Sequence, residues 1–288
     1  TLGRLTFEAE PDQYGIWTPD GQRVVFGSNR NGVANLYWRS ADGTGAVERL
    51  TESPNGQWPN AISPDGKLLV YREDVPRTSR DLFTLSLDDE RQVAPLLVTE
   101  FDELNAEISP DGRWLAYRSD ATGQAEIYVR PFPEVDAGGQ WQISTAGGTR
   151  PLWGPDGREL FYLTDAGVMG VTVETGVGFE PSAPTLVVEG TYLAPLGAPW
   201  GRTYDIAPDG QRFLMIKEGG QLNPDDPLAG LTQIHVVLNW FSDLQARVPT
   251  GRRTSLPFFS NLPILANYSG MNGHDQPRSA TTRDKRPR

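Results

Sequence analysis

Two acidic side chains, Glu107 and Asp205, are the residues of this chain best placed for general acid–base chemistry. Each lies three positions before a Pro-Asp-Gly triplet, in a short apolar segment of the kind that forms a strand. Glycosidases use two carboxyl groups on opposite sides of the bond that they cleave. Because the chain has 37 acidic residues, a shared position is weak support, and a glycosidase stays an alternative rather than the main hypothesis.

Nucleophilic hydrolysis and phosphoryl transfer have less support. A Ser-His-Asp triad would have to use His235, in an apolar segment, or His274, near the C-terminus. The sequence contains no Gly-x-Ser-x-Gly elbow, no Gly-rich phosphate loop with its lysine, no His-Arg-Asp and no Asp-Phe-Gly. Cysteine is absent, and residues 29–32 and 120–123 do not continue as a calcium loop. We therefore predict no catalytic residue, no metal site and no cofactor in this chain.

A second group of residues is suited to binding rather than reaction. The positions five before each Pro-Asp-Gly triplet, with their neighbours, combine amide, guanidinium and phenol groups, and a long loop over residues 190–201 adds an indole. We predict that the ligand-binding residues are Tyr14, Asn60, Asn105, Arg150, Trp200, Arg202 and Tyr204. Such a set can hold a peptide or a small polar ligand, since binding residues favour loops and strand ends on rigid scaffolds. The alternative is that they are ordinary solvated residues.

The element that positions all of these residues is a repeat. Pro-Asp-Gly occurs five times, with its prolines at positions 19, 64, 110, 155 and 208. The intervals of 45, 46, 45 and 53 residues are typical of four-stranded propeller blades. Proline presets the turn, aspartate hydrogen-bonds to the backbone, and glycine takes the left-handed conformation. Each triplet therefore predicts one β-turn, with a structural role for its aspartate.

Apolar segments flank every triplet in the same order. One segment precedes the triplet, a second follows it, a third comes after a polar loop, and four of the five repeats add a more polar fourth segment. This pattern predicts an all-β chain of four-stranded antiparallel meanders. Meanders of this kind close into a β-propeller whose first strands line a central channel. Five blade repeats are visible.

The repeats resemble the TolB-like, WD-repeat-like propellers, whose blades carry Ser-Pro-Asp-Gly before a basic residue and an apolar run. The resemblance covers residues 1–248, and stretches at 36–45, 127–133 and 236–240 are similar to the propeller fused to bacterial serine/threonine protein kinases. It implies a six-bladed, non-catalytic ring that binds a protein or small polar ligand at the channel mouth, as a monomer in the periplasm or another extracytoplasmic place. A propeller glycosidase, or the detached propeller domain of a serine peptidase, is the alternative.

Charge divides the chain into two parts. Residues 249–288 carry a net charge of +5, which leaves −16 for residues 1–248 out of the total of −11. We predict a propeller domain over 1–248 and a basic, disordered tail over 249–288. The acidic propeller is a poor nucleic-acid binder, because phosphate backbones need a basic surface. No apolar run is long enough to span a membrane.

The N-terminal residues 5–8, Leu-Thr-Phe-Glu, have the pattern of a fourth strand with no blade before it. This strand could complete the last blade and close the ring. Alternatively, the chain is a fragment of a longer protein and its first blade lacks three strands. We favour the fragment, because the resembling propellers have six blades.

Overall fold

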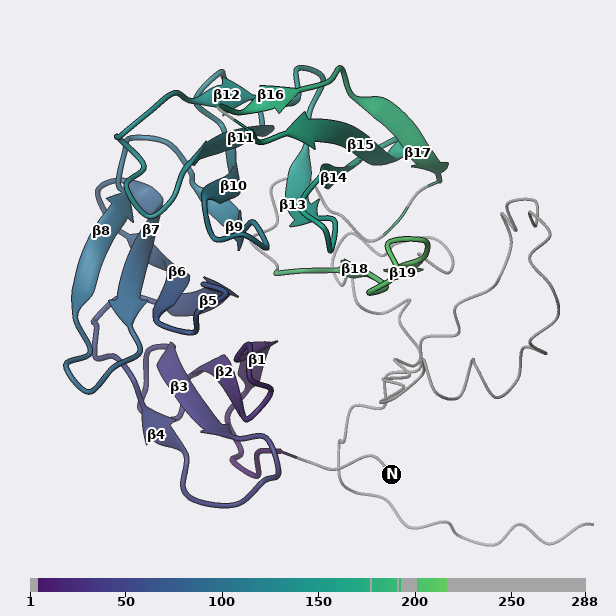
Figure 1. The fold of residues 1–288 in the computed structure, drawn as a ribbon. Coiled ribbons are helices and arrows are strands. Elements are labelled where there is room, and N and C mark those ends of the chain that lie inside the picture. Colours follow the sequence, from purple (N-terminus) through teal and green to yellow (C-terminus); the bar gives the residue numbers. More distant parts are fainter. Residues whose placement is uncertain (1–4, 177, 191, 193–200, 217–288) are drawn as a thin grey trace, which may run out of the picture. The chain divides into compact units, whose positions relative to one another are not determined.

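Strands are the only regular elements in the part of the chain that the structure describes. The structure is a computed structural model, and it describes residues 5–176, 178–190, 192 and 201–216. All of these residues belong to one unit, residues 1–218, which contains nineteen strands (Figure 1). The boundary predicted at residue 248 and the third segment of the fifth repeat, residues 233–238, lie outside the described residues.

The strands form antiparallel sheets in which consecutive strands pair. The first sheet contains β1 (Asp12–Trp17), β2 (Arg23–Ser28), β3 (Asn35–Ser40) and β4 (Glu48–Arg49), and the second contains β5 (Gln57–Ile62), β6 (Leu68–Val75), β7 (Ser79–Ser86) and β8 (Val93–Leu97). The third contains β9 (Leu104–Ile108), β10 (Trp114–Ser119), β11 (Glu126–Pro131) and β12 (Trp141–Gln142). In the fourth, β13 (Thr149–Trp153), β14 (Glu159–Thr164) and β15 (Gly167–Glu174) are followed by β16 (Glu180–Pro181) and β17 (Thr185–Glu189), both paired with β15. The fifth contains β18 (Tyr204–Ile206) and β19 (Phe213–Met215). The predicted all-β meander is confirmed.

Each Pro-Asp-Gly triplet forms the turn between the first and second strand of its sheet. The five glycines, Gly21, Gly66, Gly112, Gly157 and Gly210, have φ between 65° and 74°. The five aspartates accept a hydrogen bond from the backbone N–H two residues later, at 3.0 to 3.1 Å. Both parts of the turn prediction are confirmed, and the repeat aspartates are structural.

We expect Gly112→Ala to lower the free energy of unfolding by about 1 kcal/mol, because an L-residue is strained in the left-handed region. Space does not add to this cost, since a Cβ at Gly112 would meet only Pro64, 3.5 Å away. Urea denaturation measures the change. Gly176→Ala is the matched control, because φ at Gly176 is not left-handed and a Cβ there meets nothing within 4 Å. A loss as large at Gly176 would contradict the conformational explanation.

Successive sheets pack on one another through apolar side chains. The first strands β1, β5, β9 and β13 contact one another in that order. Buried residues of neighbouring sheets share one cluster at each junction, with Leu36 and Leu69 between the first two sheets, Leu82 and Leu115 between the next two, Ile127 and Leu160 after them, and Leu163 and Tyr204 last. This stacking holds the ends of the first strands next to each other, where the predicted binding residues lie.

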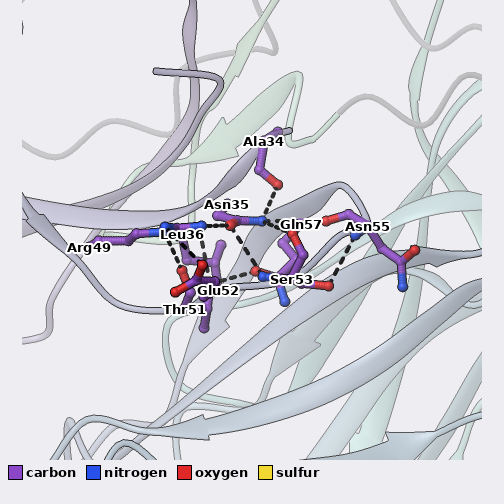
Figure 2. A network of polar contacts seen from close by, with 9 residues as sticks. All are labelled: Ala34, Asn35, Leu36, Arg49, Thr51, Glu52, Ser53, Asn55 and Gln57. Atoms are coloured by element: carbon purple, nitrogen blue, oxygen red, sulfur yellow. Dashed lines mark hydrogen bonds and ion pairs between the residues drawn. The ribbon is translucent and has the colours of Figure 1, made fainter. Parts of the chain in front are cut away.

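Polar side chains also join neighbouring sheets, and Figure 2 shows the network between the first two. Asn35 is fully buried, and its Nδ2 donates to the carbonyl oxygens of Ala34 and Ser53 at 2.9 and 3.1 Å. The network continues to β5 through the Thr51 hydroxyl, which donates to Gln57. Gln57 Nε2 then donates to Glu73 Oε2 at 2.7 Å. The network therefore connects β3 with the first and second strands of the next sheet.

Three strand predictions are wrong in detail. Residues 5–8 form no strand; Phe7 is exposed, and the Leu5 carbonyl accepts a hydrogen bond from Arg39 instead of a ladder partner. The fourth strands β4 and β12 span only two residues each, although Leu50 and Ile143, just beyond them, are buried and still donate their N–H groups to the third strands. Finally, the fourth sheet has two short outer strands, β16 and β17, where one was predicted.

Candidate functional site

A β-bulge interrupts the first strand in each of the first four sheets. The pairing shifts between Gln13 and Ile16, between Pro59 and Ala61, opposite the gap from Ala116 to Arg118, and between Thr149 and Leu152. Three bulges hold a non-glycine residue in the left-handed region, with φ of 56° at Tyr14, 54° at Asn105 and 51° at Arg150. A proline at position 59 rules out this conformation in the second sheet, where Asn60 occupies the bulge.

The bulges coincide with the predicted binding positions. Bulges re-aim side chains and are common beside functional sites, and left-handed non-glycine residues are uncommon enough to require a cause. We define the bulge cluster as Tyr14, Asn60, Asn105, Arg150 and Tyr204. The structure brings these five residues to the same end of successive first strands, whereas Trp200 lies outside the described residues.

Arg150 is the charged member of the bulge cluster, and its side chain is buried, at 2% exposure. Its Nε donates to the Gly201 carbonyl at 3.1 Å, and Nη1 lies 3.4 Å from the Thr149 hydroxyl. Tyr204 donates its hydroxyl to the Arg150 carbonyl at 2.9 Å. Burial, together with the nearby Arg118 guanidinium, lowers the pKa of Arg150 to about 10. Hydrogen bonds therefore fix both the guanidinium and the backbone carbonyl of Arg150, but no carboxylate of the described residues neutralises its charge.

The other members of the bulge cluster are held more loosely. The Thr149 hydroxyl donates to Asn105 Oδ1 at 3.3 Å, which links β13 to β9. Tyr14 is half-buried and packs beside Gly201, and its pKa is raised by burial. Asn60 is also half-buried, with its Nδ2 donating to the Pro59 carbonyl at 3.4 Å. These side chains give the strand ends a polar, partly accessible rim.

Arg202 bridges the two carboxylates that the sequence marks as acid–base candidates. Its Nη2 contacts Glu107 Oε1, and its Nη1 lies 3.4 Å from Asp205 Oδ1. The adjacent Glu107 raises the pKa of Arg202, so the guanidinium stays protonated. Glycoside hydrolysis uses two carboxyl groups with space between them for the sugar and water. Here a guanidinium occupies that space, and Arg202 belongs to this ion bridge rather than to the bulge cluster.

Sequence reasoning missed two arginines within the second strands, Arg72 and Arg118. Arg72 on β6 stacks over the Trp58 ring at 4.2 Å and pairs with Asp74 at 3.0 Å. Arg118 occupies the equivalent place on β10, is 6% exposed, and has no hydrogen-bond partner for Nε or Nη1 among the described residues. The signal was present, because both arginines directly follow the tyrosine that ends an apolar run.

The opposite rim carries a different feature, a surface hollow of about 510 Å³ between the first two sheets. Its lining includes Trp38 and the turn residues Asp20 and Asp65. Trp38 is flanked by two guanidiniums, those of Arg23 at 3.9 Å and Arg91 at 4.3 Å. Because these contacts already satisfy the indole, the hollow offers less to a ligand than the bulge cluster does.

The described part of the chain has neither a cluster of metal ligands nor a membrane-spanning helix. No three His, Asp or Glu residues gather there closely enough to hold a metal ion. Within the same residues, no helix has the length and apolar character needed to cross a membrane.

Comparison with known proteins gives a fold and no established family. No family model matches the chain. An uncharacterized protein of Agrobacterium fabrum, Atu1656, is 38% identical over 69 residues, which is 23% of this chain and 23% of that protein. The shared stretch is therefore under a quarter of the relative's length.

Solved structures extend further along the chain. A putative TolB from Agrobacterium tumefaciens superimposes with a TM-score of 0.51 at 21% identity, over 69% of this chain and 71% of that one. A puromycin-hydrolyzing peptidase of Mycobacterium tuberculosis gives a TM-score of 0.52 at 19% identity, over 71% of this chain but only 35% of the peptidase. The fold is thus that of a TolB-like β-propeller.

Proposed function

We propose that this chain is a non-catalytic binding module that takes a segment of a protein partner, or a small polar ligand, at the bulge cluster. The observation that carries the proposal is the left-handed bulge, which recurs in three sheets with a different polar side chain each time. A purely structural bulge would be satisfied by glycine, which adopts this conformation without strain. Tyr14, Asn105 and Arg150 instead place a phenol, an amide and a guanidinium side by side.

The ligand is sought with random decapeptides displayed on phage with free C-termini, selected against the full chain and then synthesised. We expect Tyr14→Asn to weaken binding of a selected peptide at least about tenfold, because an interfacial tyrosine is a common hot spot. Asparagine tolerates the left-handed backbone, so the fold is kept. Fluorescence anisotropy measures the affinity.

Trp17→Ala is the control for this substitution. Trp17 is an exposed aromatic residue at the other end of the same strand, β1. We expect its loss to leave the affinity unchanged. Equal losses for the two variants, or no loss for Tyr14→Asn, would contradict a site at the bulge cluster.

The biological setting is a separate part of the proposal. We infer an extracytoplasmic module, either the sensor region of a bacterial serine/threonine kinase or a periplasmic TolB-like protein, acting as a monomer. The likeness to 35% of a peptidase chain favours one further candidate, the propeller that accompanies a peptidase domain. Sequencing the encoding DNA on both sides discriminates among them: a kinase domain upstream, a hydrolase domain downstream, or a signal peptide directly before Thr1.

A further inference from the structure

One buried guanidinium of the bulge cluster and a second one beside it form no ion pair within the described residues. Arg118 and Arg150, which we name the guanidinium pair, are 6% and 2% exposed. Arg118 Nε and Nη1 and Arg150 Nη2 have no hydrogen-bond partner among the described residues. Buried charges are normally paired and buried N–H groups are normally hydrogen-bonded, because burying either one without a partner carries a large cost in desolvation free energy. This pair is an exception that requires an explanation.

The guanidinium pair is brought together by two neighbouring sheets. Arg118 on β10 pairs with Leu104 on β9, and the next residue, Asn105, accepts the hydrogen bond from Thr149. Thr149 directly precedes Arg150, and β10 contacts β13 (Figure 1). The two guanidiniums are close enough for Arg118 to lower the pKa of Arg150, in addition to the larger effect of burial.

Nearby carboxylates do not balance this charge. Asp74 and Asp102 are already paired with Arg72 at 3.0 Å and with Arg80 at 2.7 Å. Asp120, which also faces Arg118, accepts the backbone N–H of Asp102 at 2.9 Å. Four positive charges, on Arg72, Arg80, Arg118 and Arg150, therefore face three negative charges, on Asp74, Asp102 and Asp120. This group of residues keeps one net positive charge.

The two phenols that face Arg150 do not supply the missing charge. Burial raises the pKa of both Tyr14 and Tyr204, so both hydroxyls stay neutral. No carboxylate of the described residues interacts with Arg150, whose charged neighbour is Arg118. Within the described residues, this positive charge therefore stays uncompensated.

We propose that Arg118 and Arg150 together bind one carboxylate group of the ligand, an inference that rests on the proposed function and narrows its ligand class. Guanidinium N–H groups match the two oxygens of a carboxylate in a planar, bidentate geometry. Water is largely excluded around the pair, which strengthens the attraction. One excess positive charge fits a monoanion better than a phosphate dianion. The carboxylate belongs either to a free organic acid or to a peptide, at its C-terminus or on an acidic side chain.

The direct test follows the arginine Nε–H signals of the full ¹⁵N-labelled chain by NMR, with sodium acetate as the probe. We expect acetate to shift the Arg118 and Arg150 signals saturably, and sodium chloride at the same ionic strength to leave them in place. Inorganic phosphate is the comparison anion, expected to act more weakly. Shifts no larger with acetate than with chloride would overturn the proposal, and tighter binding of phosphate would overturn the choice of a carboxylate.

A variant gives a second readout. We expect acetate to raise the Tm of the wild-type chain and not that of Arg118→Met. Without acetate, Arg118→Met should melt at the same temperature or higher, because an unpaired buried charge is replaced by an apolar side chain of similar length. Arg113→Met, at an exposed arginine of the same sheet, is the control and should keep the acetate effect. A Tm lowered in Arg118→Met, with no acetate effect in the wild type, would show that the arginine is structural.

Selected peptides separate this inference from the proposed function. The affinity of each peptide is compared with that of two kinds of variant. One has an amidated C-terminus, and the other has each glutamate replaced by glutamine or each aspartate by asparagine. Loss of affinity by at least tenfold in one of these versions supports the carboxylate and identifies its source. Peptides that bind at the bulge cluster equally well in all versions refute the inference and leave the function standing. Saturable acetate binding in a chain that selects no peptide supports the inference and refutes the peptide-binding function.

Discussion

Asn35→Ala is expected to lower the free energy of unfolding by about 3 kcal/mol. The Asn35 amide is fully buried, and it bonds the carbonyl oxygens of Ala34 and Ser53 and the guanidinium of Arg49. Alanine removes all of these bonds from a buried site. The Ala34 carbonyl keeps the Gln57 N–H and Arg49 keeps the Thr51 carbonyl, but the Ser53 carbonyl and the Ser53 N–H lose the Asn35 amide, and each unsatisfied buried group costs about 1 to 3 kcal/mol. Urea denaturation followed by tryptophan fluorescence measures the loss.

The control for Asn35→Ala is Asn29→Ala, six residues earlier at an exposed position between β2 and β3. Its side chain is solvated, so we expect a change within about 0.5 kcal/mol. A loss below about 1 kcal/mol at Asn35 would mean that water enters the network when the amide is removed. The network between the first two sheets would then contribute little to their attachment.

The next two sheets carry a different polar residue at the position equivalent to Asn35, near the start of the third strand. Asp81 begins the equivalent part of β7 and accepts from Thr99 N–H at 3.4 Å, and Glu126 begins β11 and accepts from Gly147 N–H at 3.1 Å. An amide and two carboxylates therefore serve one purpose, the attachment of a third strand to the loop that leads into the following sheet. The chemistry differs between copies while the location stays constant.

The parts of the fold that the sequence predicted are those determined by local chemistry. Pro-Asp-Gly specifies its turn through residues in direct succession, so all five turns are found in the structure. The extent of the outer strands depends on pairing with the third strands, which is a tertiary property, and β4 and β12 are shorter than predicted. Residues 5–8 have a strand-like pattern and no described ladder partner, so the pattern alone was misleading.

The candidate site was only half predictable for the same reason. Counting back from each proline located Tyr14, Asn105 and Arg150, because a repeat places equivalent residues at equivalent points. Their left-handed backbone could not be predicted, since none is glycine. Arg118 was missed because its lack of an ion pair within the described residues depends on which carboxylates the fold assigns to Arg72 and Arg80. Charge pairing across sheets is not encoded in residue spacing.

Glu103 is expected to make the protein less stable as the pH rises from about 5 to about 8. Its carboxyl group is 2% exposed, accepts from the Thr99 hydroxyl at 2.8 Å and the Ser119 hydroxyl at 3.2 Å, and has no described partner for Oε2. Burial, aided by the nearby Asp81 and Asp120, raises its pKa from 4.5 to about 7. The folded chain therefore keeps this proton after the unfolded chain has lost it.

The sign of the pH effect follows from the raised pKa. Below pH 4.5, the reference pKa of the unfolded group, both states are protonated and the stabilisation is fully present. It falls as the pH rises toward 7, and above that both states are ionised. Each pKa unit corresponds to about 1.4 kcal/mol, so the loss over the whole range amounts to about 3 to 4 kcal/mol.

Glu103→Gln isolates this contribution, because glutamine keeps an acceptor for the two hydroxyls and does not titrate. We expect its free energy of unfolding, relative to wild type, to increase between pH 5 and pH 8, as measured by urea denaturation at each pH. Glu134→Gln, at an exposed position on a loop of the same sheet, should follow the wild-type curve. A constant difference between Glu103→Gln and wild type would mean that Glu103 ionises at its ordinary pKa in the folded chain. Because Glu103 lies two residues before Asn105, a confirmed difference would also place a proton-dependent contact next to the bulge cluster, and ligand affinity should then be compared at the same two pH values.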